Sequence, residues 1–383
     1  MAKVRRPYEY DHQYGLSLHG GRVSKPSPGG LSQGEITTGK RLTSEVSMQT
    51  TAQQVTPDRI MQIAHGFWPA SIISSAAAHD FFTHIAHGHD TADTIASAAG
   101  TDLRGTRMVL DSLVALEFLT KRDGRYGLTP DTETFLVSDR PGSLVEMIAG
   151  HPQLLWDDWG KLREVLKTGR PVTSVDESAS AGEFFPKLIR MIIPLSLGPA
   201  DAVAEHLGIG STLKGARIVD VGAGACAWTI PFARRDRAAE IIAFDSQPVL
   251  DEAAKIVREF GVADSFLMRA GDYRTDDLGD DYDIAIFGNV CHIETPDTNR
   301  QLFARAYRAL KSGGRIVIGD MVPNEERTGP PFPVMFALNM FLHSAGDTYT
   351  FGEYRNWLRE AGFPAVEPYD TRRSHSPVII GTK

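Results

Sequence analysis

The sequence predicts an α/β protein in which a doubly wound, mainly parallel sheet follows an N-terminal all-helical, winged-helix-like domain. Short apolar runs alternate with helical segments from residue 214 to the C-terminus, which is the pattern of a parallel sheet covered by helices on both faces. One such run leads into a turn of small residues, VGAGA, over residues 221–225. Helical patterns and one short hairpin occupy residues 48–140.

Size and composition narrow the class of protein. The chain has 383 residues and a formal charge of −8. This length allows two domains, and the charge argues against a general affinity for nucleic acid or anionic membrane surfaces. No apolar run approaches the roughly 18 residues of a membrane span, and no signal sequence opens the chain. Because Cys226 and Cys291 are the only cysteines, we expect a reducing, cytoplasmic location.

Residues 1–47 differ from the rest of the chain. They are rich in Gly, Ser, Pro and Thr and have no apolar period. Such a segment buries too little apolar surface to offset its ordering entropy, so we expect a disordered tail. Met48 is a candidate alternative start.

Residues 48–140 have a winged-helix outline. A helix is predicted from Asp102 to Leu119, followed by a hairpin around Asp123-Gly124. A DNA-binding domain is one interpretation, but this helix offers only Arg104 and Arg107 as cations, whereas DNA readers present a basic stripe. Its surface is mostly apolar, so we expect packing against a partner chain. The sequence therefore favours a homodimer over a DNA-binding regulator.

Residues 141–213 are predicted to be a helical connector that carries large side chains, and residues 214–383 to form the sheet domain. The expected strands cover residues 216–222, 240–245, 264–270, 282–288 and 314–320. The terminal run HSPVIIGTK suits a final antiparallel strand. Ligands bind such sheets at the carboxyl ends of the strands, near the point where the strand order reverses.

The first strands carry the residues of a nucleotide site in a Rossmann-like arrangement. Gly222 and Gly224 allow a tight turn and a close approach to a ligand. Asp245 ends the next strand about 20 residues later, where a carboxylate can accept both hydroxyls of a ribose. Asp220 and Asp272 complete an ordered series. A Gly-x-Gly turn alone can be merely a tight connection, but the series as a whole indicates adenosine.

A dinucleotide-binding fold is the main competitor. The third glycine of its G-x-G-x-x-G pattern is absent, because position 227 is Ala. The sheet also comes late in the chain and ends with the expected antiparallel strand. These differences favour S-adenosylmethionine as the ligand.

At this point the sequence resembles the class I, S-adenosylmethionine-dependent small-molecule O-methyltransferases, a family that includes the caffeate and acetylserotonin types and bacterial pigment and antibiotic enzymes. The resemblance covers about residues 56–383. It rests on VDVGAGA, on the acidic end of the second strand and on NVCH followed by a helix and LKSGGRIVIGD. The stretch ALNMFLHSAGDTYTFGEYRNWLREAGF adds a long match near the end.

The resemblance implies roles for individual residues. His292 matches the histidine that acts as general base, and Asp320 is an acidic partner that could orient its imidazole. Methyl transfer is an in-line displacement, so alignment and a deprotonated nucleophile supply most of the rate. The residues expected to bind the cofactor are Asp220, Gly222, Gly224, Asp245, Ser246, Gly271, Asp272, Tyr273 and Asn289.

The sequence departs from the family at several positions. The usual His-Asp-Trp is His292-Ile293-Glu294, a lysine near the adenine is replaced by Gly288, and Cys226 stands at the third glycine of the turn. A second acidic residue is matched only approximately, by Asp347 or Glu353. These departures bear on the acceptor, so C-methylation or a drift to decarboxylation or hydroxylation stays open.

Large side chains at helical spacing are candidates for an apolar acceptor pocket, although many such residues belong to a core. Met335, Asn339 and His343 lie four residues apart and would share one helix face. The residues expected to contact an aromatic or polycyclic acceptor are Trp156, Phe185, Met191, Phe336, Asn339, Met340 and His343; Trp159 and Phe184 are further candidates. A metal site at His84, His87 and His89 is not favoured, and the expected chemistry requires none.

Overall fold

The computed structural model describes residues 55–172 and 181–383, with side chains at these positions except 153–154 and 181–187. The tail expected over residues 1–47 lies outside the described residues. By its contacts the chain separates into residues 1–66 and 67–383. Helix α1 (Asp58–Ala64) belongs to the first unit, and all further elements belong to the second.

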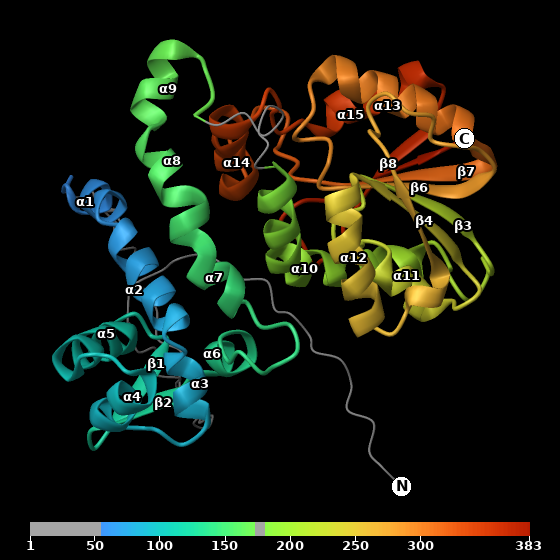
Figure 1. Ribbon diagram of the computed structural model, residues 1–383. Coiled ribbons are helices and arrows are strands. Elements are labelled where there is room, and N and C mark those ends of the chain that lie inside the picture. Colours follow the sequence, from blue (N-terminus) through green and yellow to red (C-terminus); the bar gives the residue numbers. More distant parts are fainter. Residues whose placement is uncertain (1–54, 173–180) are drawn as a thin grey trace, which may run out of the picture. The chain divides into compact units, whose positions relative to one another are not determined.

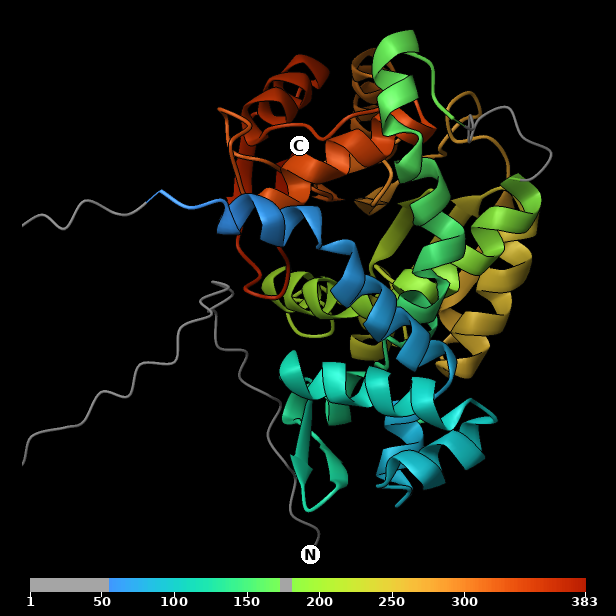
Figure 2. The same cartoon turned by 90° about the vertical axis from the view of Figure 1, so that its left-hand side faces the viewer.

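The predicted helices and hairpin are present in the first part of the second unit. Its elements are α2 (Phe67–Ala78), α3 (Phe81–Ala86), α4 (Ala92–Ala99), α5 (Leu103–Ala115), β1 (Leu119–Arg122), β2 (Arg125–Leu128) and α6 (Pro130–Phe135). Figure 2 shows the hairpin as two short antiparallel arrows. Asp123 and Gly124 form its turn, both with positive φ, as the type I′ hairpin turn requires.

The helix expected from Asp102 to Leu119 is shorter than predicted. The Asp102 carboxylate accepts the Gly105 N–H and caps the start of α5, which ends at Ala115. Glu117 then takes a left-handed conformation with φ of 63°, and Leu119 pairs with Leu128 in the hairpin. The apolar run therefore continues through two different elements, which periodicity alone does not separate.

The apolar side chains of α5 are only partly buried. Leu110 and Leu113 are fully buried in the core of this region, whereas Leu103 and Met108 stay exposed. On α2, Phe67 and Trp68 are also exposed. Most of the apolar residues expected on the surface of the helix predicted from Asp102 to Leu119 therefore belong to the core of this region, whereas Met108 stays exposed.

The connector consists of consecutive helices. They are α7 (Val145–His151), the π-helical turn η1 (Pro152–Trp156), α8 (Asp157–Gly160), α9 (Leu162–Thr168) and the long α10 (Ala181–His206).

The predicted doubly wound sheet is confirmed (Figure 1). Its seven strands follow the order β5-β4-β3-β6-β7-β9-β8. They are β3 (Arg217–Val221), β4 (Glu240–Asp245), β5 (Phe266–Ala270), β6 (Tyr282–Gly288), β7 (Leu310–Gly319), β8 (Ala365–Tyr369) and β9 (Val378–Thr382). The first five are parallel, and β9 runs antiparallel to both β7 and β8. The strand order reverses between β3 and β6. A ligand is therefore expected to bind at the carboxyl ends of the strands near this point.

The predicted terminal antiparallel strand is β9, while β8 was not expected. Its sequence, AVEPY, has no apolar run and is largely exposed. Pro368 is tolerated there because β8 lies at the end of the sheet.

Alternate strand residues face two separate cores. Ile218 and Ile286 pack with α10, α11 (Ile230–Arg235) and α12 (Gln247–Glu259). Val219 and Phe287 pack with α13 (Pro296–Ala309) and α15 (Phe351–Ala361) on the other face. Burial on both faces explains the continuous apolar runs of the central strands. Helix α14 (Pro331–His343) follows β7.

Candidate active site

The small-residue turn after β3 depends on its glycines. Gly222 has φ of 66°, and a Cβ there would lie 2.5 Å from Val290 Cγ2. Gly224 is also left-handed, with φ of 52°. Cys226, at the third family glycine, adopts φ of 57° despite its side chain. The turn therefore keeps its shape at that departure, at a local backbone cost of about 1–2 kcal/mol.

Asp245 braces this turn from the end of β4. Its Oδ2 accepts the Gly224 N–H at 2.9 Å, and its Oδ1 accepts the Ser246 N–H at 2.7 Å. Burial raises the pKa of Asp245, while these backbone hydrogen bonds oppose the rise. A carboxylate has about four lone-pair sites, so accepting capacity is left for a ribose.

Asp220 lies beneath the turn and is fully buried. Its Oδ2 accepts the Thr229 hydroxyl at 2.5 Å. Burial raises the pKa of Asp220 to about 7, although the Thr229 hydrogen bond opposes this. Asp220 thus connects the end of β3 to Thr229, the residue that follows the turn and precedes α11.

The loop after β5 meets the same edge. The Gly271 N–H donates to the Asp245 carbonyl, and a Cβ at Gly271 would lie 2.5 Å from Asp276 Oδ2. The Tyr273 ring lies close to Gly222, at 3.5 Å from an ideal Cβ there. Asp272 is exposed. Glycine turn, carboxylate and aromatic ring thus gather at the ends of β3, β4 and β5, a set that fits an adenosine group.

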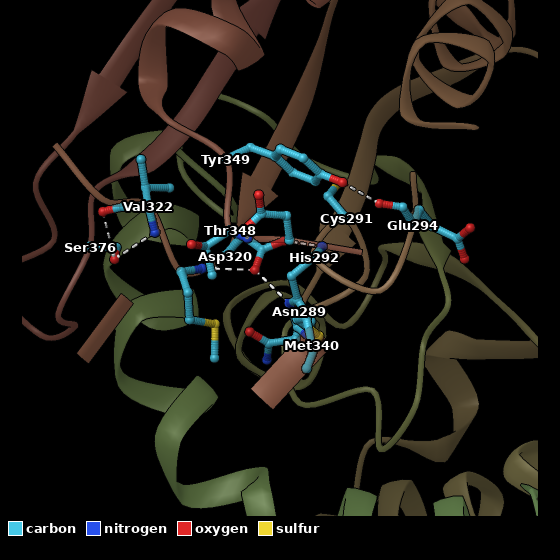
Figure 3. Close-up of polar contacts among 12 residues, drawn as sticks. Asn289, Cys291, His292, Glu294, Asp320, Val322, Met340, Thr348, Tyr349 and Ser376 are labelled. Atoms are coloured by element: carbon cyan, nitrogen blue, oxygen red, sulfur yellow. Dashed lines mark hydrogen bonds and ion pairs between the residues drawn. The ribbon is translucent and has the colours of Figure 1, made fainter. Parts of the chain in front are cut away.

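His292 and Asp320 form a buried pair at the ends of β6 and β7 (Figure 3). The His292 Nδ1 lies 2.6 Å from Asp320 Oδ1, and the His292 backbone N–H donates to Asp320 Oδ2 at 3.0 Å. An ionised carboxylate only accepts, so the imidazole carries its proton on Nδ1. Nε2 is then the nitrogen with the free lone pair.

Two further donors complete the Asp320 site. The Met321 N–H donates to Oδ1 at 2.7 Å, and the Tyr354 hydroxyl donates to Oδ2 at 3.2 Å. Burial and the Asp320 charge raise the pKa of Tyr354 well above its ordinary value, so its hydroxyl stays a donor. Phe336 lies edge-on against the His292 ring, with centroids 5.1 Å apart.

Asn289 closes β6 in a strained conformation. Its φ is 60°, its N–H donates to the Gly319 carbonyl, and its Nδ2 donates to Ser196 Oγ of α10 at 3.3 Å. Left-handed asparagine beside the reversal point marks a place where the chain leaves the sheet abruptly.

The two approximate matches for a second acidic residue have other partners. Glu353 caps α15 and accepts Arg327 Nη2 at 2.8 Å. Asp347 accepts the Thr348 N–H at 2.7 Å and lies 3.7 Å from Arg327. The contacts described for His292 include neither carboxylate. Between them, Thr348 is buried, and its hydroxyl has no partner among the described residues.

Several candidate acceptor contacts already have protein partners. Asn339 Oδ1 accepts the Trp159 indole N–H at 3.1 Å. Both ring nitrogens of His343 are engaged, Nδ1 with the Asn339 carbonyl at 2.8 Å and Nε2 with Asp158 Oδ2 at 3.1 Å. These bonds tie α14 to α8, so His343 has no spare ring nitrogen in this state.

The other acceptor candidates differ in exposure. Met340 is buried, Met191 is half-buried, and Trp156 is exposed. The side chain of Phe185 lies outside the described residues. Met335, which shares the helix face of Asn339, is exposed as well.

Trp228 explains one departure that sequence reasoning left without a cause. A Cβ at Gly288 or at Gly319 would overlap its indole ring. The family lysine therefore cannot stand at position 288 while Trp228 fills this space. The only available signal was a large residue in the turn before α11, which does not reveal its distant neighbours.

Among the described residues, no group of three or more His, Cys, Asp and Glu side chains is arranged to hold a metal ion; His87 instead pairs with Asp139. No helix in the described ranges is long and apolar enough to cross a membrane.

The strand order, the glycine turn and the acidic strand end together define the class I methyltransferase fold. A family model of the O-methyltransferase domain matches residues 210–364, and a model of the O-methyltransferase dimerisation domain matches residues 61–138. The chain belongs to this O-methyltransferase family, whose methyl donor is S-adenosylmethionine. The predicted family resemblance is thereby confirmed.

Known proteins similar to this chain cover most of its length. The 3-hydroxy-5-methyl-1-naphthoate 3-O-methyltransferase of Streptomyces sahachiroi is 27% identical over 85% of this chain and 95% of its own. The L-tyrosine C(3)-methyltransferase of Streptomyces lavendulae is 25% identical over 73% and 80%. The crystal structure of a putative O-methyltransferase from Nostoc punctiforme matches with a TM-score of 0.78 at 25% identity, over 86% of this chain and all of that one.

Proposed function

We propose that this chain methylates a hydroxyl group of a small aromatic or polycyclic acceptor, with His292 as the general base. The observation that carries the proposal is the buried His292–Asp320 pair at the ends of β6 and β7. It leaves Nε2 unprotonated beside the edge where the residues proposed to bind adenosine gather. S-adenosylmethionine supplies a methyl group activated by its bond to a positively charged sulfur.

The chain's own groups then handle the proton. As the hydroxyl oxygen forms its bond to the methyl carbon and the sulfur–carbon bond breaks, His292 Nε2 takes the hydroxyl proton. The resulting imidazolium is stabilised by Asp320 through the Nδ1 hydrogen bond of 2.6 Å. Because Asp320 is held by further donors, it can fix the ring without moving.

The cofactor and acceptor residues follow from the same placement. Asp245 would accept ribose hydroxyls. The remainder of the proposed cofactor site would be lined by Gly222, Gly224, Ser246, Gly271 and Tyr273. Asp220, Asp272 and Asn289 would support this edge. Among the acceptor candidates we favour Phe336, because it packs against the His292 ring, and Met340, because it lies one turn further along α14.

C-methylation is the second candidate. A relative of similar identity is named as a C(3)-methyltransferase acting on L-tyrosine. Removal of a phenol proton by His292 would also activate the neighbouring ring carbon, so the same base suits both outcomes.

We also propose a homodimer in the cytoplasm. Phe67, Trp68, Leu103 and Met108 are exposed apolar side chains on α2 and α5, and they lie within the residues matched by the dimerisation model. A second copy of the chain would remove this surface from water.

The test begins with calorimetric titration of S-adenosylhomocysteine into the wild type and Asp245→Ala. We expect micromolar binding in the wild type and its loss in the variant. A phenol panel with labelled methyl donor then identifies an acceptor, and the site of the label distinguishes O- from C-methylation. Turnover of that acceptor by His292→Gln at the wild-type rate would refute the role of His292.

A further inference from the structure

Glu294 is a buried carboxylate that the expected mechanism leaves without a role. Its Oε1 accepts the Tyr273 hydroxyl at 2.7 Å and the Arg274 Nε–H at 2.8 Å. Its side chain is only 5% exposed, whereas that of Arg274 is 35% exposed. Burial of a carboxylate costs free energy of hydration, and hydrogen bonds and a charge partner must offset that cost.

Both donors belong to the loop after β5. The same loop is held from α13, where Arg305 Nη1 donates to the carbonyls of Tyr273 and Arg274 at 2.8 and 2.9 Å. Glu294 therefore binds the side chains of this short segment, and Arg305 binds its backbone carbonyls. That segment carries Tyr273, whose ring lies close to Gly222.

Glu294 itself is part of the turn that carries His292. The Ile293 N–H donates to the Val290 carbonyl, and the Glu294 N–H donates to the Cys291 carbonyl. Asn299 of α13 donates to the Cys291 carbonyl at 2.9 Å. The Tyr349 hydroxyl donates to the Glu294 carbonyl at 2.5 Å (Figure 3). The turn is thus rigid, so a displacement of Glu294 would reach His292.

We propose that Glu294 is a positioning residue that connects the cofactor-binding loop after β5 to the His292 turn. The inference rests on the proposed function. Methyl transfer needs the methyl carbon, the acceptor oxygen and the base in line, and an error of about 1 Å is costly. A carboxylate shared by both segments holds the donor side and the base side of the reaction in one register.

A merely structural carboxylate predicts a different result. If Glu294 only stabilised the fold, its replacement would lower the melting temperature. The variant molecules that stay folded would still bind the cofactor with wild-type affinity. The positioning role predicts an effect on cofactor affinity and on the environment of the His292 ring. Readouts of these two properties separate the alternatives.

The test uses Glu294→Ala, Glu294→Gln and Tyr273→Phe in the full chain, with S-adenosylhomocysteine as the probe. Asp297→Asn is the matched control, because Asp297 forms an ion pair with Arg300 nearby but is 87% exposed. Calorimetry gives the Kd. Histidine ring signals, with that of His292 assigned by its loss in His292→Gln, report whether the probe moves the base.

We expect Glu294→Ala to raise the Kd about tenfold, the scale of one lost charge-assisted hydrogen bond. Glu294→Gln keeps an accepting oxygen and should recover much of this loss. The double variant Glu294→Ala/Tyr273→Phe should bind no worse than Glu294→Ala, because Tyr273→Phe removes a hydrogen bond that Glu294→Ala has already removed. The probe should shift the His292 signal in the wild type and less in Glu294→Ala.

Wild-type binding in Glu294→Ala, or strictly additive losses in the double variant, would overturn this inference and leave the proposed function intact. If Glu294→Ala does not fold, Tyr273→Phe, which removes the same hydrogen bond from the side of the loop, should raise the Kd, and wild-type binding in that variant would overturn the inference. Failure of the wild type to bind the probe would instead refute the proposed function, and this inference with it.

Discussion

Replacement of Asp320 by Asn is the sharpest test of the proposed base. Each Asp320 oxygen accepts two hydrogen bonds: Oδ1 from His292 Nδ1 and the Met321 N–H, Oδ2 from the His292 N–H and the Tyr354 hydroxyl. An amide offers only one accepting oxygen, so either orientation turns its NH2 group toward two groups that now donate. The volume of the side chain is almost unchanged.

Both orientations harm the base in a definite way. If the NH2 group faces Nδ1, it donates to that nitrogen, and the proton moves to Nε2, where it blocks proton acceptance. If it faces the other side, the His292 N–H loses its acceptor, which costs about 1–3 kcal/mol. We therefore expect kcat to fall by about 10²–10⁴-fold, the range of general-base contributions.

The assay measures methyl transfer to an acceptor found by the phenol screen, together with the Kd of S-adenosylhomocysteine. Affinity for the latter should change by less than about threefold, since Asp320 contacts none of the residues proposed to hold adenosine. Asp297→Asn is the control, because it replaces an exposed carboxylate outside the proposed site by the same amide. A kcat of Asp320→Asn equal to that of the wild type would refute the reasoning.

Three further predictions concern the turn, the buried acid and the apolar surface. Gly222→Ala should abolish S-adenosylhomocysteine binding, because a Cβ would meet Val290 at 2.5 Å with φ at 66°; unchanged affinity would contradict this. The pKa of Asp220 is raised to about 7 by burial, so its neutral form stabilises the fold at low pH and this contribution is lost as pH rises from about 4 through 7. Asp220→Asn should remove that part of the slope of unfolding free energy with pH, at most about 1.4 kcal/mol per pH unit, and an identical slope in denaturant titrations would exclude it. Met108→Glu should weaken the proposed dimer in sedimentation equilibrium, and a mass equal to that of a dimeric wild type would place the interface away from Met108, which is 44% exposed.

Local patterns were sufficient for much of the fold. The central strands β3, β4, β6 and β7 bury both faces and therefore appear as continuous apolar runs, so they were located within a few residues. The edge strand β5 was located as well, although it is only partly buried. The hairpin turn at Asp123-Gly124 was also predictable, because few residue pairs tolerate its backbone angles. The helix ending at Ala115 was predicted too long, since an apolar run does not record where the chain changes element.

The sequence by itself, through its resemblance to a known family, indicated the family, the cofactor class and the candidate residues His292 and Asp320, because the matching motifs lie at or just after the ends of apolar strands. Only the tertiary structure decided what distant residues share. In the folded chain Trp228 packs against Gly288 and Gly319. Glu353 accepts a hydrogen bond from Arg327, and Glu294 accepts one from Tyr273. These contacts unite segments far apart in the chain, and no local period encodes which side chains will meet when strands and helices pack.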